Sequence, residues 1–143
     1  MSNFITALNC SINMKTNRMK YAIAGHYPPI VYRSSTGDFI RLEARGRLLG
    51  FIRGIEVEEK EMQLLAGDRL VLYTDGITDA LNQAEELYGE KQLLDVVRQY
   101  KTLTAEQVQE GILRAVQHFV GLVQQFDDMA LVIVKRESQL SDN

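Results

Sequence analysis

The sequence predicts an α+β domain in which antiparallel strands come first and two helices precede a last strand. The chain has 143 residues, of which 45% are hydrophobic, so it can bury the core of one domain. Its first half alternates apolar and polar residues with the period of strands, whereas residues 90–123 place apolar residues with the period of helices. This order of elements suits a layered α+β domain better than a doubly wound one.

Residues 4–33 are expected to form a hairpin followed by a bend. An apolar start leads into a polar stretch at residues 15–20, and the apolar pattern resumes in YAIAGHYPPIVYR. Gly25 and the pair Pro28-Pro29 interrupt this second segment, because glycine permits unusual backbone angles and proline cannot donate to a strand ladder. A turn or a strand crossing is therefore expected there.

The following segments alternate turns with short strands. The Thr-Gly-Asp sequence at 36–38 predicts a turn, and FIRLE predicts a short strand after it. IEVEEKEMQLL alternates charged with apolar residues, which is typical of an edge strand with one solvated face. The Ala-Gly-Asp sequence at 66–68 predicts a tight turn before the apolar strand RLVLYTD.

Two helices are expected in the second half, the first from about Glu90 and the second after a capping box formed by Thr104 and Gln107. Their apolar faces consist of Leu87, Leu93, Leu94, Val97 and Tyr100 in the first, and Val108, Ile112, Val116, Phe119, Val120 and Val123 in the second. Residues 124–128 should end the second helix, and MALVIVK should form a buried strand. Two helices are too few to cover both faces of a sheet with strands this apolar.

Composition excludes several classes of function. The net charge of −3 offers no basic field for nucleic acid, and no stretch reaches the roughly 18 apolar residues of a membrane span. The start of the chain lacks the pattern of a signal peptide. The single Cys10 excludes an internal disulfide framework and is expected to be a core thiol. These features predict a soluble, cytoplasmic segment.

Two pairs of carboxylates flank predicted strands. Asp75 and Asp79 follow the strand RLVLY, and Asp127 and Asp128 immediately precede the strand MALVIVK. Carboxylates without a cluster of His or Cys suit Mg²⁺ or Mn²⁺, which prefer oxygen ligands. The two strand ends are therefore interpreted as halves of one metal site, resting on Asp75 and Asp127.

Plainer alternatives remain open at this point. Asp75-Gly76 can be only a turn and Asp127-Asp128 only a helix-to-strand junction, because Asp often accepts backbone hydrogen bonds in such places. The segment YTDGIT also partly fits the DxDGT pattern of haloacid-dehalogenase phosphatases. That interpretation fails, because Tyr73 stands where the pattern needs its Asp nucleophile.

Five segments occur in an order that resembles one known family. They are FITAL, AGHYPPIVYR, GRLLG, GDRLVLYTDGITDA and FDDMALVIV, and the last four are similar to the family patterns AGH-x-P-P, G-x-P-L-G, GD-x-L-x-L-Y-T-D-G-x-x-E-A and DD-x-T-L-L-V. The family is that of the bacterial metal-dependent serine/threonine phosphatases of the sporulation protein E and stress-regulator type, which are related to protein phosphatase 2C. The match covers nearly the whole chain and outweighs the plainer alternatives.

The resemblance implies an antiparallel β-sandwich flanked by α-helices, with two Mn²⁺ or Mg²⁺ ions at one end. By this resemblance Asp75 and Asp127 are metal ligands. Their neighbours Asp79 and Asp128 are either further ligands or residues that hold the structure and orient ligands or waters. In this chemistry two ions roughly 4 Å apart lower the pKa of a shared water, which attacks the phosphoserine phosphorus. Gly76 would let the backbone come close to the metal.

The AGH motif is given a structural role. Gly25 and His26 are expected to lie at a strand crossing, with the histidine tethering the backbone of a buried turn. General-acid catalysis by His26 is the less favoured alternative. His118, in the second predicted helix, is given no function.

The departures from the family limit what this segment is expected to do. An earlier family motif, whose Asp bridges the two metals, does not occur in this chain. Residues 1–136 are therefore expected to be the C-terminal part of a phosphatase catalytic domain, incomplete at its N-terminus, with residues 137–143 as a polar tail. Such a segment alone should have little or no activity. Leu48 and Ala130 replace the family's Pro and Thr and are milder departures.

Two other classes of function stay open. The chain can be a catalytically silent module that docks on a partner in a sigma-factor pathway, or an exposed apolar sheet face can make it a homodimer. For the intact enzyme, the resemblance suggests a phosphoserine protein substrate such as an anti-sigma antagonist.

Overall fold

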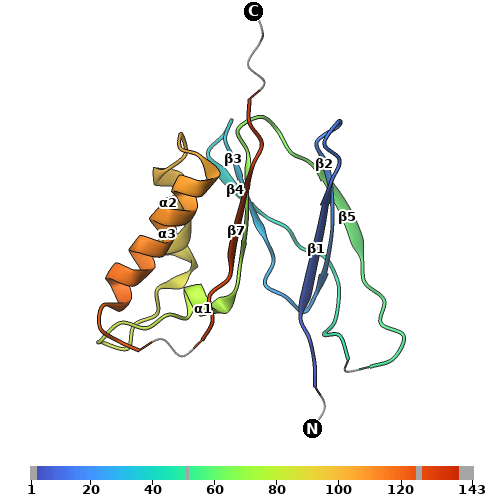
Figure 1. Ribbon diagram of the computed structural model, residues 1–143. Helices are drawn as coiled ribbons and strands as arrows, with labels where there is room; N and C mark the ends of the chain where they lie inside the picture. Colours follow the sequence, from blue (N-terminus) through green and yellow to red (C-terminus); the bar gives the residue numbers. More distant parts are fainter. Residues whose placement is uncertain (1–2, 51, 125–126, 139–143) are drawn as a thin grey trace, which may run out of the picture.

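The computed structural model describes residues 3–50, 52–124 and 127–138 and arranges them in three layers (Figure 1). One layer is a three-stranded antiparallel sheet of order β1-β2-β5, and the second is a four-stranded antiparallel sheet of order β4-β3-β6-β7. Helices α2 and α3 form the third layer, on the outer face of the four-stranded sheet. The strands are β1 (Ala7–Ile12), β2 (Arg18–Ala24), β3 (Ile30–Arg33), β4 (Asp38–Arg41), β5 (Glu59–Gln63), β6 (Arg69–Tyr73) and β7 (Leu131–Lys135). The helices are α1 (Asp75–Thr78), α2 (Gly89–Gln99) and α3 (Ala105–Val120). The sequence-based α+β prediction and the antiparallel sandwich are confirmed.

The predicted hairpin and strand crossing are both present. β1 and β2 pair antiparallel with Ala7 opposite Ala24, and the chain then leaves this sheet and enters the other one as β3. The change of sheet takes place within residues 25–29, where Gly25 has a φ of +67°. This backbone conformation favours glycine, because a Cβ would clash with the chain.

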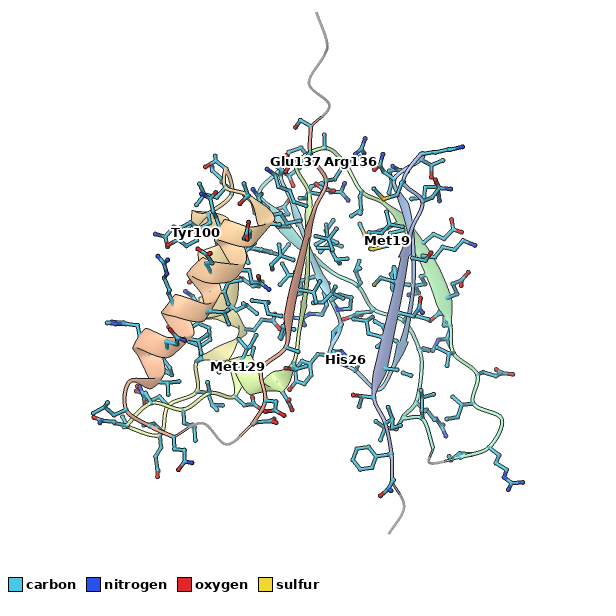
Figure 2. The ribbon with its side chains drawn as sticks, viewed as in Figure 1. Met19, His26, Tyr100, Met129, Arg136 and Glu137 are labelled. Carbon is cyan, nitrogen blue, oxygen red and sulfur yellow. The ribbon has the colours of Figure 1, made fainter. Side chains whose placement is uncertain are left out.

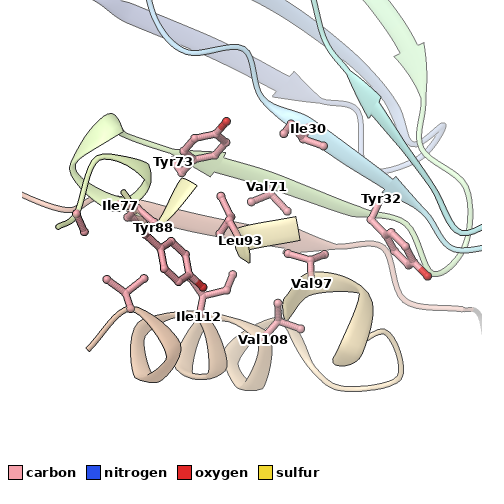
Figure 3. Packing of buried hydrophobic residues seen from close by; sticks show 12 residues of the cluster. Ile30, Tyr32, Val71, Tyr73, Ile77, Tyr88, Leu93, Val97, Val108 and Ile112 are labelled. Carbon is pink, nitrogen blue, oxygen red and sulfur yellow. The ribbon is translucent and has the colours of Figure 1, made fainter. Parts of the chain in front are cut away.

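Two apolar clusters hold the layers together. The cluster between the sheets is built from alternate residues of β2 together with Val31, Leu42, Leu64 and Leu70. The cluster between the four-stranded sheet and the helices is larger (Figure 3) and includes Ile30, Tyr32, Val71, Tyr73, Ile77, Tyr88, Leu93, Val97, Val108, Ile112 and Val116. The predicted apolar faces of the helices therefore supply one side of this cluster.

The capping box at the start of α3 is confirmed. The Thr104 side chain accepts a hydrogen bond from the backbone of Gln107, and the Gln107 side chain accepts one from the backbone of Thr104. α3 ends at Val120, so Val123 lies beyond the helix rather than on its apolar face. Residues 125 and 126, within the predicted end of the helix, lie outside the described residues, as does most of the predicted tail (139–143).

Two predictions about apolar residues are wrong. Leu87 does not belong to the first helix, since α2 begins at Gly89 and Leu87 is 57% exposed in the preceding loop. The strand MALVIVK is not fully buried, because β7 lies at the edge of its sheet and Val132 is 51% exposed.

The uncovered apolar surface lies at an edge rather than on a sheet face. The outer face of the three-stranded sheet is polar and carries ion pairs, such as those of Glu61 with Arg18 and Lys20, so it needs no helical cover. The open region instead lies between the edge strands β1 and β7, where residues such as Leu8, Cys10 and Leu131 line a hollow of about 450 Å³. The expectation of an exposed apolar sheet face is thus corrected to an open side of the sandwich.

Within the described ranges, no helix combines the length and the apolar character needed to span a bilayer.

Candidate metal centre

The first carboxylate pair lies where β6 passes into the short helix α1. β6 ends at Tyr73, Thr74 precedes the helix, and Asp75 occupies its first turn. Asp75 is half-buried, whereas Asp79 follows the last residue of α1 and is exposed. The Asp79 amide donates to the Asp75 carbonyl at 2.7 Å, which fixes the backbone between the two residues.

The second carboxylate pair is held against this corner by backbone contacts. The Thr74 amide donates to the Ala130 carbonyl at 3.1 Å, and the Ala130 amide donates to the Thr74 hydroxyl at 3.0 Å. These bonds extend the pairing of β6 with β7, in which Tyr73 is opposite Leu131. The segment that carries Asp127 and Asp128 therefore lies beside the start of α1.

Gly76 shows how closely the two segments approach. A Cβ at this position would lie 2.1 Å from the carbonyl oxygen of Asp128, which is far inside van der Waals contact. Figure 2 shows Met129, the next residue, beside α1. Gly76 is thus required by the approach of two backbones to each other, which is a more specific reason than the predicted approach to a metal.

The carboxylates that the sequence singled out gather at this end of the molecule. Asp79 and Asp127 line the same small cavity, and Asp128 donates its amide to the Asp127 carboxylate at 2.8 Å. Carboxylate oxygens are the right donor type for Mg²⁺ or Mn²⁺. Among the described residues, however, no three His, Cys, Asp or Glu side chains lie close enough together to hold an ion. The donors therefore fit Mg²⁺ or Mn²⁺ in type, but the described residues alone bring too few of them together to hold an ion.

A polar network that the sequence did not predict extends from the buried Tyr73, two residues before Asp75, to the protein surface. The Tyr73 hydroxyl donates to the Glu90 carboxylate at 2.8 Å, and Glu90 also forms an ion pair with Arg41. Burial and the Glu90 carboxylate raise the pKa of Tyr73. The three residues join the end of β6, the end of β4 and the first turn of α2. No local pattern marks them, because they come from three separate elements.

The electrostatic potential around Tyr27, near the end of β6, is negative. The ring of Tyr27 lies 6.0 Å from that of Tyr73, centroid to centroid. Burial raises the pKa of the Tyr27 phenol, and the charges of Asp79, Asp75 and Glu90 raise it further. Removing a proton from Tyr27 would add a negative charge beside three carboxylates, which explains the direction of the shift.

The AGH motif makes structural contacts around the strand crossing. A Cβ on Gly25 would lie 2.5 Å from Cδ2 of Leu48, so the AGH and GRLLG segments pack directly against each other. His26 is half-buried, and its Nδ1 lies 2.9 Å from the Tyr27 carbonyl oxygen, a contact within the turn. Together with Thr74, His26 lines the hollow between the sheets. Figure 2 shows His26 between the two sheets. The tethering role of His26 stays a prediction.

Comparison with known proteins agrees with this fold. Residues 1–137 match the model of the family described as stage II sporulation protein E (SpoIIE). The phosphoserine phosphatase RsbU of Bacillus subtilis is 29% identical over 140 residues, which are 95% of this chain and 40% of RsbU. The chain thus spans less than half of that relative.

Two solved structures share the fold. The SiaA-PP2C domain of Pseudomonas aeruginosa superposes with a TM-score of 0.83 at 16% identity, over 96% of this chain and 54% of that domain. The Mn-presoaked phosphatase domain of SpoIIE from B. subtilis superposes with a TM-score of 0.66 at 22% identity, over 94% of this chain and 58% of that domain.

Proposed function

Because this chain belongs to the SpoIIE family of phosphatase 2C-like domains, we propose that it is part of a metal-dependent protein serine/threonine phosphatase. In this proposal residues 1–136 are the C-terminal part of the catalytic domain, and residues 137–143 are a polar tail. The observation that carries it is the backbone contact between Gly76 and Asp128, because this contact brings the two carboxylate segments to one place.

Asp75 and Asp127 are the proposed ligands of Mn²⁺ or Mg²⁺, two ions in the intact domain. When bound, such ions supply an activated water for the hydrolysis of a phosphate monoester. Asp128, whose carbonyl group makes the contact with Gly76, and Asp79, just after α1, would orient ligands or waters. The network of Tyr73, Glu90 and Arg41 supports the end of β6 and so holds Asp75 in place.

The open side of the sandwich supports the incompleteness of this segment. The outer edges of β1 and β7 are not paired with another strand among the described residues, and apolar residues line the hollow between them. Unpaired strand edges and an open apolar hollow are unfavourable in water unless they are covered. Further strands from the remainder of the phosphatase domain would cover both, and would bring the ligands that this segment lacks.

The proposed substrate is a phosphoserine on a regulatory protein, such as an anti-sigma antagonist. A relative that matches most of this chain is a phosphoserine phosphatase. We expect that the 143-residue chain alone is inactive, because fewer than three candidate ligands lie together in its described part.

The same open edge also favours a second candidate function. A catalytically silent module could use β1 and β7 to dock on a partner of a sigma-factor pathway or on a second copy of itself. Sedimentation of the chain at two concentrations tests the homodimer, since a monomer at every concentration contradicts it.

The deciding experiment measures Mn²⁺-dependent release of phosphate from a phosphoserine protein. The samples are the chain alone, a longer protein that includes an upstream Asp motif, and the Asp75→Asn variant of each. We expect activity only in the longer protein with Asp75 intact. A longer protein that never releases phosphate would contradict the enzyme and favour the docking module.

A further inference from the structure

A small cavity opens beside the proposed metal ligands, between α1 and the end of α3. Its volume is about 90 Å³. Apolar walls come from Ala80 and Leu81, just after α1, and from Val120 and Val123 at the end of α3. Figure 1 shows α1 and the C-terminal end of α3 at the same end of the molecule.

Two carboxylates belong to the lining of this apolar cavity. They are those of Asp79 and Asp127. Asp79 is exposed and takes part in none of the ion pairs found in the described part of the chain. The charge of Asp79 also reaches the Tyr27 phenol, whose pKa it helps to raise. Within the described ranges, the cavity therefore combines apolar walls with one carboxylate, that of Asp79, for which no ion pair is found.

This combination suits a long basic side chain. Lysine and arginine have an aliphatic stem that packs on apolar surface and a cationic head that remains near water or a carboxylate. A purely apolar side chain would leave Asp79 unpaired, and an acidic one would be repelled by it. The space is too small for more than about one such stem, since one water occupies about 30 Å³ of liquid.

We propose that this cavity is a specificity subsite that takes the side chain of a Lys or Arg close to the phosphoserine in the protein substrate. The stem lies against Leu81, Val120 and Val123, and the cation lies at Asp79. The inference rests on the proposed function only for the identity of the substrate; the preference of the cavity for a basic side chain can be measured without catalysis.

The size of the effect follows from the exposure of Asp79. Ion pairs at exposed positions contribute at most about 1 kcal/mol, so replacing arginine by neutral citrulline should weaken binding by up to about fivefold. Removal of the stem as well, by replacing arginine with alanine, should weaken binding further, because each buried methylene contributes favourably.

The test uses nuclear magnetic resonance of the 143-residue chain with three short peptides. Each peptide contains a phosphoserine, and the three peptides of a set differ only at one nearby position, which is arginine, citrulline or alanine. Successive sets place this variable position at different distances from the phosphoserine. The signals to follow are the backbone amides of Leu81, Val120 and Val123. We expect at least one set in which the arginine peptide shifts these amides at a lower concentration than the citrulline peptide does, by up to about fivefold.

Matched variants locate the binding. Val123→Phe fills the cavity and should abolish the shifts at Leu81 and Val120. Leu122→Phe is the control, because its neighbour Leu122 is 93% exposed and does not line the cavity. Asp79→Asn should remove the preference for arginine over citrulline. The peptide comparison on the unmodified chain keeps the test valid if a variant does not fold.

The outcomes separate this inference from the proposed function. Preference for arginine at these amides supports the subsite, even if the longer protein never releases phosphate and the phosphatase proposal fails. Equal binding of arginine and citrulline in every set, or no binding of any peptide, overturns the subsite whatever the phosphatase assay shows. Displacement of the arginine peptide by Mn²⁺ alone also overturns it, because the cavity would then be an ion site.

Discussion

Replacement of Gly76 by alanine should separate the two carboxylate segments. The Cβ would meet the Asp128 carbonyl oxygen at 2.1 Å, whereas real Cβ atoms essentially never come closer than 3.0 Å to another heavy atom. The two backbones must therefore move apart by 0.9 Å, the difference between these distances. Neither side of the contact is a flexible side chain that could turn away.

The structure gives an approximate cost for this movement. Overpacking of a tight contact costs about 1–3 kcal/mol. The two hydrogen bonds between Thr74 and Ala130 would lengthen, and each contributes about 1 kcal/mol. Alanine recovers roughly 1 kcal/mol through its higher helix propensity. We expect the free energy of unfolding to fall by about 2–4 kcal/mol, and the affinity for Mn²⁺ to fall about tenfold or more because the ligand positions shift.

Urea unfolding followed by far-ultraviolet circular dichroism measures the stability, and titration with Mn²⁺ measures the affinity. Gly54→Ala is the control: a Cβ there meets nothing within 4 Å, although φ is +72°. Its cost should be limited to about 1–2 kcal/mol of backbone strain, with unchanged Mn²⁺ affinity. A Gly76→Ala variant with the urea midpoint and the Mn²⁺ affinity of the unmodified chain would refute the close contact as an organiser of the site.

Three further predictions follow from individual side chains. Asp68→Ala should lower the free energy of unfolding by about 3–5 kcal/mol in urea, because its fully buried carboxylate forms a 2.8 Å ion pair with Arg33 that would lose one partner. Tyr73→Phe should cost about 0.5–1.5 kcal/mol through the lost bond to Glu90. Because the folded pKa of Tyr73 is raised, its neutral phenol stabilises the fold fully below the unfolded value of about 10, and this contribution is lost as pH rises above it. The Phe variant should therefore lose less stability than the unmodified chain when unfolding is compared at pH 9 and pH 11, and an equal loss would contradict the assignment. Thr104→Ala should lower the thermal midpoint through about 1 kcal/mol of lost capping, and an unchanged midpoint would mean that the capping box contributes nothing.

Local patterns in the sequence predicted the elements whose formation is itself local. The capping box is a contact between residues three apart, and it was predicted correctly. The hairpin of β1 and β2 was also predictable, because the polar stretch between the two apolar segments is short. The four-residue helix α1 was not predicted, since one turn is too short to show a period.

Contacts between distant segments were the limit of the sequence-based prediction. Gly25 and the two prolines indicated a turn or a crossing between β2 and β3, but strand patterns gave no sign of which strands lie at the sheet edges, so the apolar surface was expected on a face instead of at an open edge. The ion pair of Arg41 with Glu90 joins residues 49 positions apart. The approach of the segments that carry Asp75 and Asp127 was predictable only as two strand ends, and the glycine contact at Asp128 appears only in the structure.

The measurement that tests the central claim most directly is electron paramagnetic resonance of Mn²⁺ added to the chain. The claim is that Asp75 and Asp127 are metal ligands, and that this segment supplies only part of the metal centre. We predict that the chain binds at most one Mn²⁺, weakly, and that either Asp75→Asn or Asp127→Asn abolishes the binding. Asp38→Asn, a change at an exposed carboxylate in β4, should leave it intact. Binding that survives both Asp75→Asn and Asp127→Asn, or tight binding of two ions by the unmodified chain, would contradict the account.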